Sequence, residues 1–160
     1  MSFSAVDHAM MSRALQLAER AKYSVTPNPA VGAVVTKNGE ILGEGFTRPP
    51  GGNHAEIEAL QQAGDVSGGT LYVTLEPCSH QGKTGPCSQA VIEAKLGRVV
   101  VACEDPNPQV CGSGINQLKA AGIEVEIGLL EDQARELNRG FFKRFAEGMP
   151  WILVKMAASL

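Results

Sequence analysis

Hydrophobic and polar positions follow two different periods along the first third of the chain. Residues 4–22 keep apolar side chains at helical spacing and begin with a capping-box pattern. Residues 30–37 and 40–47 are rich in residues typical of strands, and they flank Asn38-Gly39, the strongest short signal for a β-hairpin. The pattern therefore predicts a helix followed by an antiparallel pair of strands.

Short apolar stretches and helical stretches alternate along the rest of the chain, and several of the helical stretches end at glycine. The expected elements are helix 54–64, strand 70–75, helix 87–97, strand 98–103, helix 115–122, strand 123–128, a long helix near 131–147 and a strand over 150–160. This order predicts an α/β fold of three α/β/α layers, whose mixed sheet is entered by the N-terminal hairpin. Ligands bind such sheets at the carboxyl ends of the strands, which here are the loops at 76–86 and 104–114.

The composition excludes several classes of protein and of binding partner. The 160 residues are 44% hydrophobic and 19% charged, which is typical of a globular protein and excludes a disordered chain. The net charge of −3 gives no basic surplus for binding nucleic acid or an anionic membrane. We find no membrane-spanning run and no secretory signal at the N-terminus, so we expect a cytoplasmic protein with neither nucleic acid nor membrane as partner.

Four cysteines lie within residues 78–111. A chain of this size and composition folds without disulfides in the cytoplasm, so the thiols raise the question of metal binding or catalysis. Cys103 ends an apolar strand and is expected to be a buried small hydrophobic residue, whereas Cys111 is a loop thiol. Cys78 and Cys87 remain as the candidates for chemistry.

His54, Cys78 and Cys87 have the composition of a three-ligand zinc site. Such a site leaves the fourth tetrahedral position open for water, as catalytic zinc requires, whereas structural sites are normally closed by four ligands. His54 and Glu56 begin one predicted helix and Cys87 begins another, so the side chains can converge on a point beyond the two helix starts. Glu56 would then lie beside the water as the acid and base.

An H-x-E element followed by Pro-Cys and a further Cys is the signature of zinc deaminases, in which the Glu is not a ligand. The second thiol follows the first by nine positions here rather than three. With this spacing, TLEPCSHQGKTGPC (74–87) closely resembles the pyrimidine deaminases of riboflavin biosynthesis, the amino-terminal half of a bifunctional deaminase/reductase. The resemblance continues in TPNPAVGAVV (26–35), HAEIEAL (54–60), DPNPQV (105–110), AGIEVEIGLL (121–130) and LNRGFFKR (137–144).

The resemblance implies a cytidine-deaminase-like fold and zinc-dependent deamination of 2,5-diamino-6-ribosylamino-4(3H)-pyrimidinone 5′-phosphate to 5-amino-6-ribosylaminouracil 5′-phosphate. Matched by motif, the zinc ligands are His54, Cys78 and Cys87, and Glu56 is catalytic. The residues that match the substrate pocket of the family are Asn28, His80, Lys83, Asp105 and Asn107. The sequence departs from the family pattern at three positions. The family usually has His in place of Thr47, Pro or Ala in place of Asn53, and Pro in place of Gly85.

The resemblance also implies a division of the chain. Residues 1–148 would be the deaminase domain, and residues 149–160 the opening strand of a C-terminal NADP-dependent reductase domain. The expected partners are a small pyrimidine ribonucleotide-like substrate and that reductase domain. The apolar stretch WILVKM and the resemblance together suggest a homo-oligomer.

Two other functions fit part of the pattern. A zinc deaminase of cytosine, guanine or adenosine in transfer RNA shares the H-x-E and Pro-Cys elements, but it typically has the close Cys pair. An RNA-acting enzyme would also need a basic, aromatic face, whereas aromatic residues make up only 5% of this acidic chain. A non-catalytic, zinc-stabilised domain is the second alternative, and it would have no use for Glu56.

Overall fold

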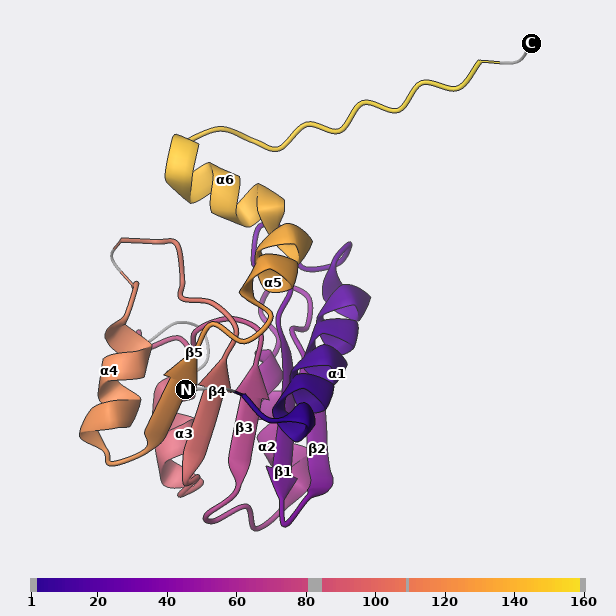
Figure 1. Ribbon diagram of the computed structural model, residues 1–160. Coiled ribbons are helices and arrows are strands. Elements are labelled where there is room, and N and C mark those ends of the chain that lie inside the picture. Colours follow the sequence, from indigo (N-terminus) through magenta and orange to yellow (C-terminus); the bar gives the residue numbers. More distant parts are fainter. Residues whose placement is uncertain (1–2, 81–84, 109, 159–160) are drawn as a thin grey trace.

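The computed structural model describes residues 3–80, 85–108 and 110–158, which form a five-stranded sheet covered by helices (Figure 1). The strands are β1 (Gly32–Lys37), β2 (Glu40–Phe46), β3 (Thr70–Val73), β4 (Arg98–Val101) and β5 (Glu124–Ile127). They lie in the order β2-β1-β3-β4-β5, with β1 antiparallel to both of its neighbours and β3, β4 and β5 parallel to one another. The mixed sheet and its entry by a hairpin confirm the predicted fold class.

Six helices accompany this sheet in the described part of the chain. They are α1 (Ala5–Ala21), α2 (Ala55–Ala63), α3 (Cys87–Glu93), α4 (Ser113–Ala120), α5 (Glu131–Leu137) and α6 (Arg139–Glu147). Helix α1 packs on β1, β2 and β3 from one face, whereas α2, α3 and α4 cover the other face (Figure 1). Helices α5 and α6 extend past the ends of the strands. The sheet is therefore buried on both faces, as its apolar strands require.

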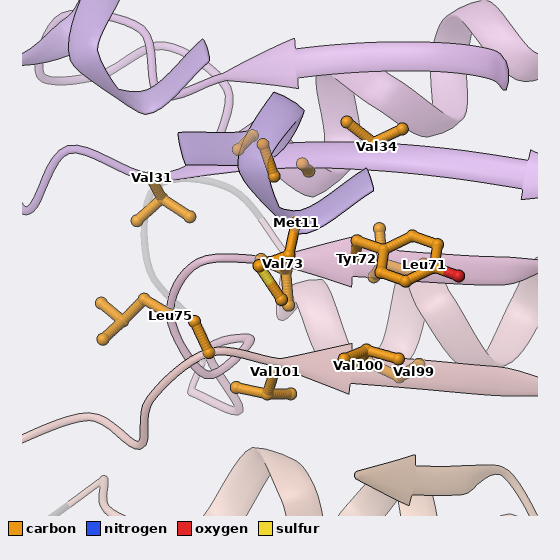
Figure 2. Packing of buried hydrophobic residues seen from close by; sticks show 14 of the residues in the cluster. Met11, Val31, Val34, Leu71, Tyr72, Val73, Leu75, Val99, Val100 and Val101 are labelled. Atoms are coloured by element: carbon orange, nitrogen blue, oxygen red, sulfur yellow. The ribbon is translucent and has the colours of Figure 1, made fainter. Parts of the chain in front are cut away.

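The core consists mainly of small and branched side chains. Figure 2 shows the central valines and leucines of β1, β3 and β4 in one cluster with Met11 from α1. Helix α1 begins at the predicted capping box, in which the backbone N–H of Asp7 donates to Ser4 Oγ over 3.1 Å. The hairpin turn is also as predicted, since Asn38 and Gly39 adopt φ values of 54° and 83°.

A glycine sets the distance between β2 and the helix that carries two of the candidate site residues. A Cβ atom on Gly45 would lie 2.2 Å from the carbonyl oxygen of Ala55, at the start of α2. Gly45 therefore lets the first turn of α2 lie directly against the strand. This close approach sets the position of His54 and Glu56 at the start of α2.

Two predictions about the C-terminal part are wrong. The single helix expected over 131–147 is broken at Asn138, whose backbone leaves helical geometry at φ −105° and ψ 24°. Its side chain bonds to the backbone N–H and carbonyl of Ala30, while its own N–H still donates to the Ala134 carbonyl and its carbonyl still accepts from Phe142 N. Helical periodicity does not record this tertiary contact of the side chain. Residues 150–158 form no strand, because within the described chain they have no neighbouring strand to supply hydrogen bonds. They run away from the sheet with their apolar side chains exposed (Figure 1).

Candidate active site

The site begins at the first turn of α2. His54 is the N-cap residue of this helix, with extended backbone angles (φ −76°, ψ 163°), and Glu56 follows within the first turn. The side chain of His54 is partly buried, and only 3% of Glu56 is exposed. Both residues line the same cavity. The structure therefore brings them together beyond the helix start, as the predicted geometry requires.

Two thiols reach the same point from the next strand-and-helix unit. Cys78 lies in the loop that follows β3, and Cys87 is the first residue of α3. The two segments are joined by the backbone, since Cys87 N donates to Cys78 Sγ over 3.4 Å and Ser88 N donates to the carbonyl of Cys78 over 3.0 Å. Cys78 and the start of α3 thus lie side by side, so that two helix starts face one point.

The three side chains fit a zinc ion. His54 Nδ1 lies 3.5 Å from Cys78 Sγ and 3.3 Å from Cys87 Sγ, and all three ligand atoms lie within 4.8 Å of one another. Tetrahedral zinc, with Zn–S near 2.3 Å and Zn–N near 2.0 Å, requires S···N separations of about 3.5 Å. In the described part of the chain this group has no fourth His, Cys, Asp or Glu, so these three residues would hold zinc and leave it room for a water ligand.

The protonation of the two thiols is coupled through a shared hydrogen bond. The Cys87 thiol donates to Cys78 and thereby lowers the pKa of the Cys78 thiol, to which His54 also contributes. The same bond, together with burial, raises the pKa of the Cys87 thiol. The hydrogen bond to Cys78 also raises the pKa of His54. Zinc would bind both sulfurs as thiolates, and the backbone N–H of Cys87 already donates to one of them.

The carboxyl group of Glu56 lies beside this group. Burial raises the pKa of its carboxyl group to about 7, and the group also contacts the thiol of Cys87. Glu56 is outside the three-residue metal group, and its role as an acid and base stays a prediction.

The predicted substrate residues gather around the same cavity, whose volume is about 240 Å³. Asn28, His80, Asp105 and Asn107 line it together with His54, Glu56 and Cys78. Lys83, the fifth predicted residue, lies outside the described residues. The four described residues come from three separate loops, and their roles toward a substrate stay predictions.

The positions that depart from the family pattern have ordinary structural partners in two cases. Thr47 is buried in the cavity wall, where its Oγ1 accepts from Val31 N over 3.2 Å and donates to the Val31 carbonyl over 3.4 Å. Asn53 donates from Nδ2 to Glu58 Oε1 over 2.9 Å. Gly85 is exposed beside the start of α3.

Several residues that line the cavity were not predicted from the sequence, among them Glu76, Phe141 and Phe145. Glu76 is 4% exposed, and Phe141 and Phe145 reach the cavity from α6. The two rings contact each other edge to face, with centroids 5.0 Å apart. Their i,i+4 spacing was available in the sequence, but it did not say which face of the molecule α6 covers.

Outside the site, the other thiols lie where the sequence predicts. Cys103 is buried, and its Sγ donates to the carbonyl of Thr74 over 3.3 Å, whereas Cys111 is exposed. Burial raises the pKa of the Cys103 thiol to about 12, so this residue is inert rather than nucleophilic.

A comparison with protein families matches residues 4–103 to the zinc-binding region of cytidine and deoxycytidylate deaminases. The diaminohydroxyphosphoribosylamino-pyrimidine deaminase of Buchnera aphidicola (subspecies Acyrthosiphon pisum) is 50% identical over 88% of this chain and 96% of its own length. The chain belongs to this deaminase family. Family membership and fold confirm the resemblance seen in the sequence, and they identify the family as a zinc-binding one.

Longer members of the family are equally similar. The riboflavin biosynthesis protein RibD of Haemophilus influenzae is 52% identical over the whole chain, which spans 43% of that protein. The structure of Acinetobacter baumannii RibD superposes with a TM-score of 0.89 at 52% identity, over 91% of this chain and 41% of that one. The chain therefore spans less than half the length of these two deaminase relatives. No helix in the described ranges has the length and apolar character to cross a membrane.

Proposed function

We propose that the chain hydrolytically deaminates 2,5-diamino-6-ribosylamino-4(3H)-pyrimidinone 5′-phosphate, giving 5-amino-6-ribosylaminouracil 5′-phosphate and ammonia. One observation carries the proposal. The metal-binding group of His54, Cys78 and Cys87 opens onto a cavity that also holds the Glu56 carboxyl group. The similar Buchnera protein is named for deamination of this pyrimidine, which supports the choice of substrate.

His54, Cys78 and Cys87 would hold Zn²⁺. When bound, zinc would supply a Lewis acid that lowers the pKa of a coordinated water to about 7. Glu56 would accept a proton at its carboxylate, pass it to the ring nitrogen beside the carbon under attack, and finally protonate the departing amine. The first proton from water would stay on the ring nitrogen. A second proton, which Glu56 would take from the hydroxyl group added to the ring carbon as the carbonyl forms, would leave with ammonia, so Glu56 would end the cycle in its starting state. Burial of this carboxyl group keeps bulk water from competing for the proton.

The cavity wall would orient the substrate. Asn28, Asp105 and Asn107 offer amide and carboxylate groups suited to the hydrogen-bonding edge of a diaminopyrimidine. His80 at the mouth of the cavity, and Lys83, would bind the ribose phosphate, because a lysine ammonium is a point charge suited to phosphate. Within the described chain, Phe141 and Phe145 supply aromatic surface for the ring face.

Ammonia release tests the substrate assignment. The purified, zinc-loaded protein is incubated separately with the diaminopyrimidine ribosyl phosphate, with cytosine and with guanine. We expect ammonia from the first compound and none above background from the other two. Release from cytosine or guanine alone would replace this proposal with a deaminase of a free base, and release from none would leave a non-catalytic zinc domain as the better account.

Metal analysis tests the ligand set. We expect one zinc per wild-type chain and loss of zinc in Cys87→Ser, because a serine hydroxyl replaces one of the two thiolates. Cys103→Ser is the matched control, since this buried thiol lies outside the metal group. Full zinc content in Cys87→Ser would contradict the proposed site.

The other expected associations stay proposals. We propose that residues 149–160 lead into an NADP-dependent reductase domain, which is consistent with the length of the RibD relatives. We also propose a homo-oligomer and a cytoplasmic location. Sedimentation of the isolated chain would measure the oligomeric state directly.

A further inference from the structure

The carboxylate of Glu76 is held in a cage of backbone N–H groups. Its Oε1 accepts from Gly114 N over 2.9 Å and from Ile115 N over 3.3 Å. Its Oε2 accepts from Gly112 N over 2.9 Å and from Asp105 N over 3.2 Å. All four donors lie in one segment, residues 104–115, far along the chain from Glu76. A single side chain therefore bonds to described residues near both ends of that segment.

Part of this cage is the start of a helix. Gly114 and Ile115 lie in the first turn of α4, where backbone N–H groups have no partner within the helix. A carboxylate at this end also interacts favourably with the helix dipole. Helix capping by Glu76 is thus one role that the bonds fulfil. It does not account for the bond to Asp105, which lies well before the helix.

The remaining bond reaches residues of the candidate substrate pocket. The backbone N–H of Asp105 donates to Glu76, and the side-chain Oδ1 of Asp105 accepts from Asn107 N over 2.8 Å. Asp105 and Asn107 both line the cavity. The bonds therefore run without interruption from Glu76 to the turn that presents these two side chains.

At its other end, Glu76 is anchored to the metal-binding loop. It is followed by Pro77 and Cys78, and its own N–H donates to the carbonyl of Cys103 over 3.0 Å. A Cβ atom on Gly114 would lie 2.0 Å from the carbonyl oxygen of Pro77, so the first turn of α4 touches the metal-binding loop directly. The metal ligand Cys78 and the segment 104–115 are thus linked through the short, buried stretch of Glu76 and Pro77.

We propose that Glu76 is a positioning residue, which holds the segment with Asp105 and Asn107 in register with Cys78 and so sets where the substrate ring lies relative to the metal group. In this role Glu76 acts through its hydrogen bonds, because both of its oxygens accept from backbone N–H groups. The inference rests on the proposed deaminase function for its kinetic test, but its structural test is independent of that function.

The test variant is Glu76→Gln. An amide keeps the size of the side chain but turns one oxygen into an NH₂ group that faces backbone donors, so two of the four bonds are lost. Asp7→Asn is the matched control. Asp7 is also a buried carboxylate with several donors around it, but its partners Ser4, Tyr72 and Arg98 lie away from the cavity. Both variants remove one charge from a bonded carboxylate.

Hydrogen exchange followed by mass spectrometry gives the structural readout. We expect faster exchange over residues 104–116 in Glu76→Gln, with zinc content unchanged, and no change of that segment in Asp7→Asn. Unchanged exchange in Glu76→Gln, or loss of its zinc, would overturn the inference. This result is obtained whether or not the chain deaminates the proposed substrate.

Steady-state kinetics separate positioning from capping. We expect Glu76→Gln to raise KM about tenfold, as for the loss of a charge-assisted hydrogen bond, whereas Asp7→Asn leaves KM unchanged. In an Asn107→Ala background, Glu76→Gln should cost much less in kcat/KM, because the group that it positions is already absent. Equal losses in both backgrounds would show that Glu76 acts only by stabilising α4. Inactivity of the wild type would refute the proposed function alone.

Discussion

Glu56 and Glu76 line the same cavity, but their surroundings give them different chemistry. Glu56 is buried beside a thiol, and burial raises the pKa of its carboxyl group. Glu76 is equally buried but is surrounded by four backbone N–H donors. A carboxyl group must be free to gain and lose a proton if it is to act as an acid and base. Of the two, Glu56 is the one suited to proton transfer.

Glu56→Gln should abolish most activity without releasing the metal. Glutamine cannot accept a proton, so we expect kcat to fall by about 10²- to 10⁴-fold, the usual contribution of an acid and base. Zinc content should stay at the wild-type value, since Glu56 is outside the metal group. Ammonia release and metal analysis on the same preparation check both expectations.

Glu58→Gln is the matched control for this variant. Glu58 lies on the same helix, but it pairs with Arg48 and Asn53 outside the cavity. Its loss should leave kcat unchanged. Wild-type activity in Glu56→Gln would remove Glu56 from the mechanism.

At the scale of elements, the sequence was informative wherever a local signal determined the structure. Asn38-Gly39 predicted the hairpin, and the helix starts at His54 and Cys87 predicted how the metal group converges. Glu76 and Asn138 were missed because their partners lie far away in the sequence. No period or motif records that Asn138 will bond to Ala30, so the break between α5 and α6 could not be predicted from helical spacing.

Asn138 determines how α6 meets the cavity. Its Oδ1 accepts from Ala30 N and its Nδ2 donates to the Ala30 carbonyl, both over 2.8 Å, and the side chain is buried. Asn138→Ala leaves both backbone groups without partners, so we expect a loss of about 1–3 kcal/mol in the free energy of unfolding. KM should rise as well, because Phe141 and Phe145 follow directly on the released helix.

Urea denaturation and steady-state kinetics measure the two effects of Asn138→Ala. Asn116→Ala on the exposed surface of α4 is the control, and it should change stability by less than about 0.5 kcal/mol. If Asn138→Ala were as stable as Asn116→Ala, the bond to Ala30 would not be what holds α6 in place.

At the scale of the whole molecule, the cavity and the main network of ion pairs lie in different parts of the sheet. The cavity lies at the carboxyl ends of β3 and β4, where the predicted loops leave the sheet. At the amino end of β4, Arg98 pairs with Asp7 of α1 and with Glu126 of β5. Tyr72 of β3 donates to the same Asp7 over 2.8 Å. This network joins a helix to three strands without touching the cavity.

The network predicts how stability changes in acid. The hydrogen bond from the Arg98 guanidinium holds the pKa of the Asp7 carboxyl group well below its ordinary value, against the opposing effect of burial. A carboxyl group whose pKa is lowered by folding stabilises the protein above its unfolded-state pKa of about 3.9, and this contribution is lost as the pH falls toward the folded-state pKa. Urea denaturation of the wild type from pH 7 to pH 3 should therefore show a free energy of unfolding that falls steeply below about pH 5. Asp7→Asn should be less stable than the wild type at pH 7. Its free energy of unfolding should fall less on acidification, so that the two curves approach each other at low pH. Parallel curves would mean that Asp7 does not link this network to folding.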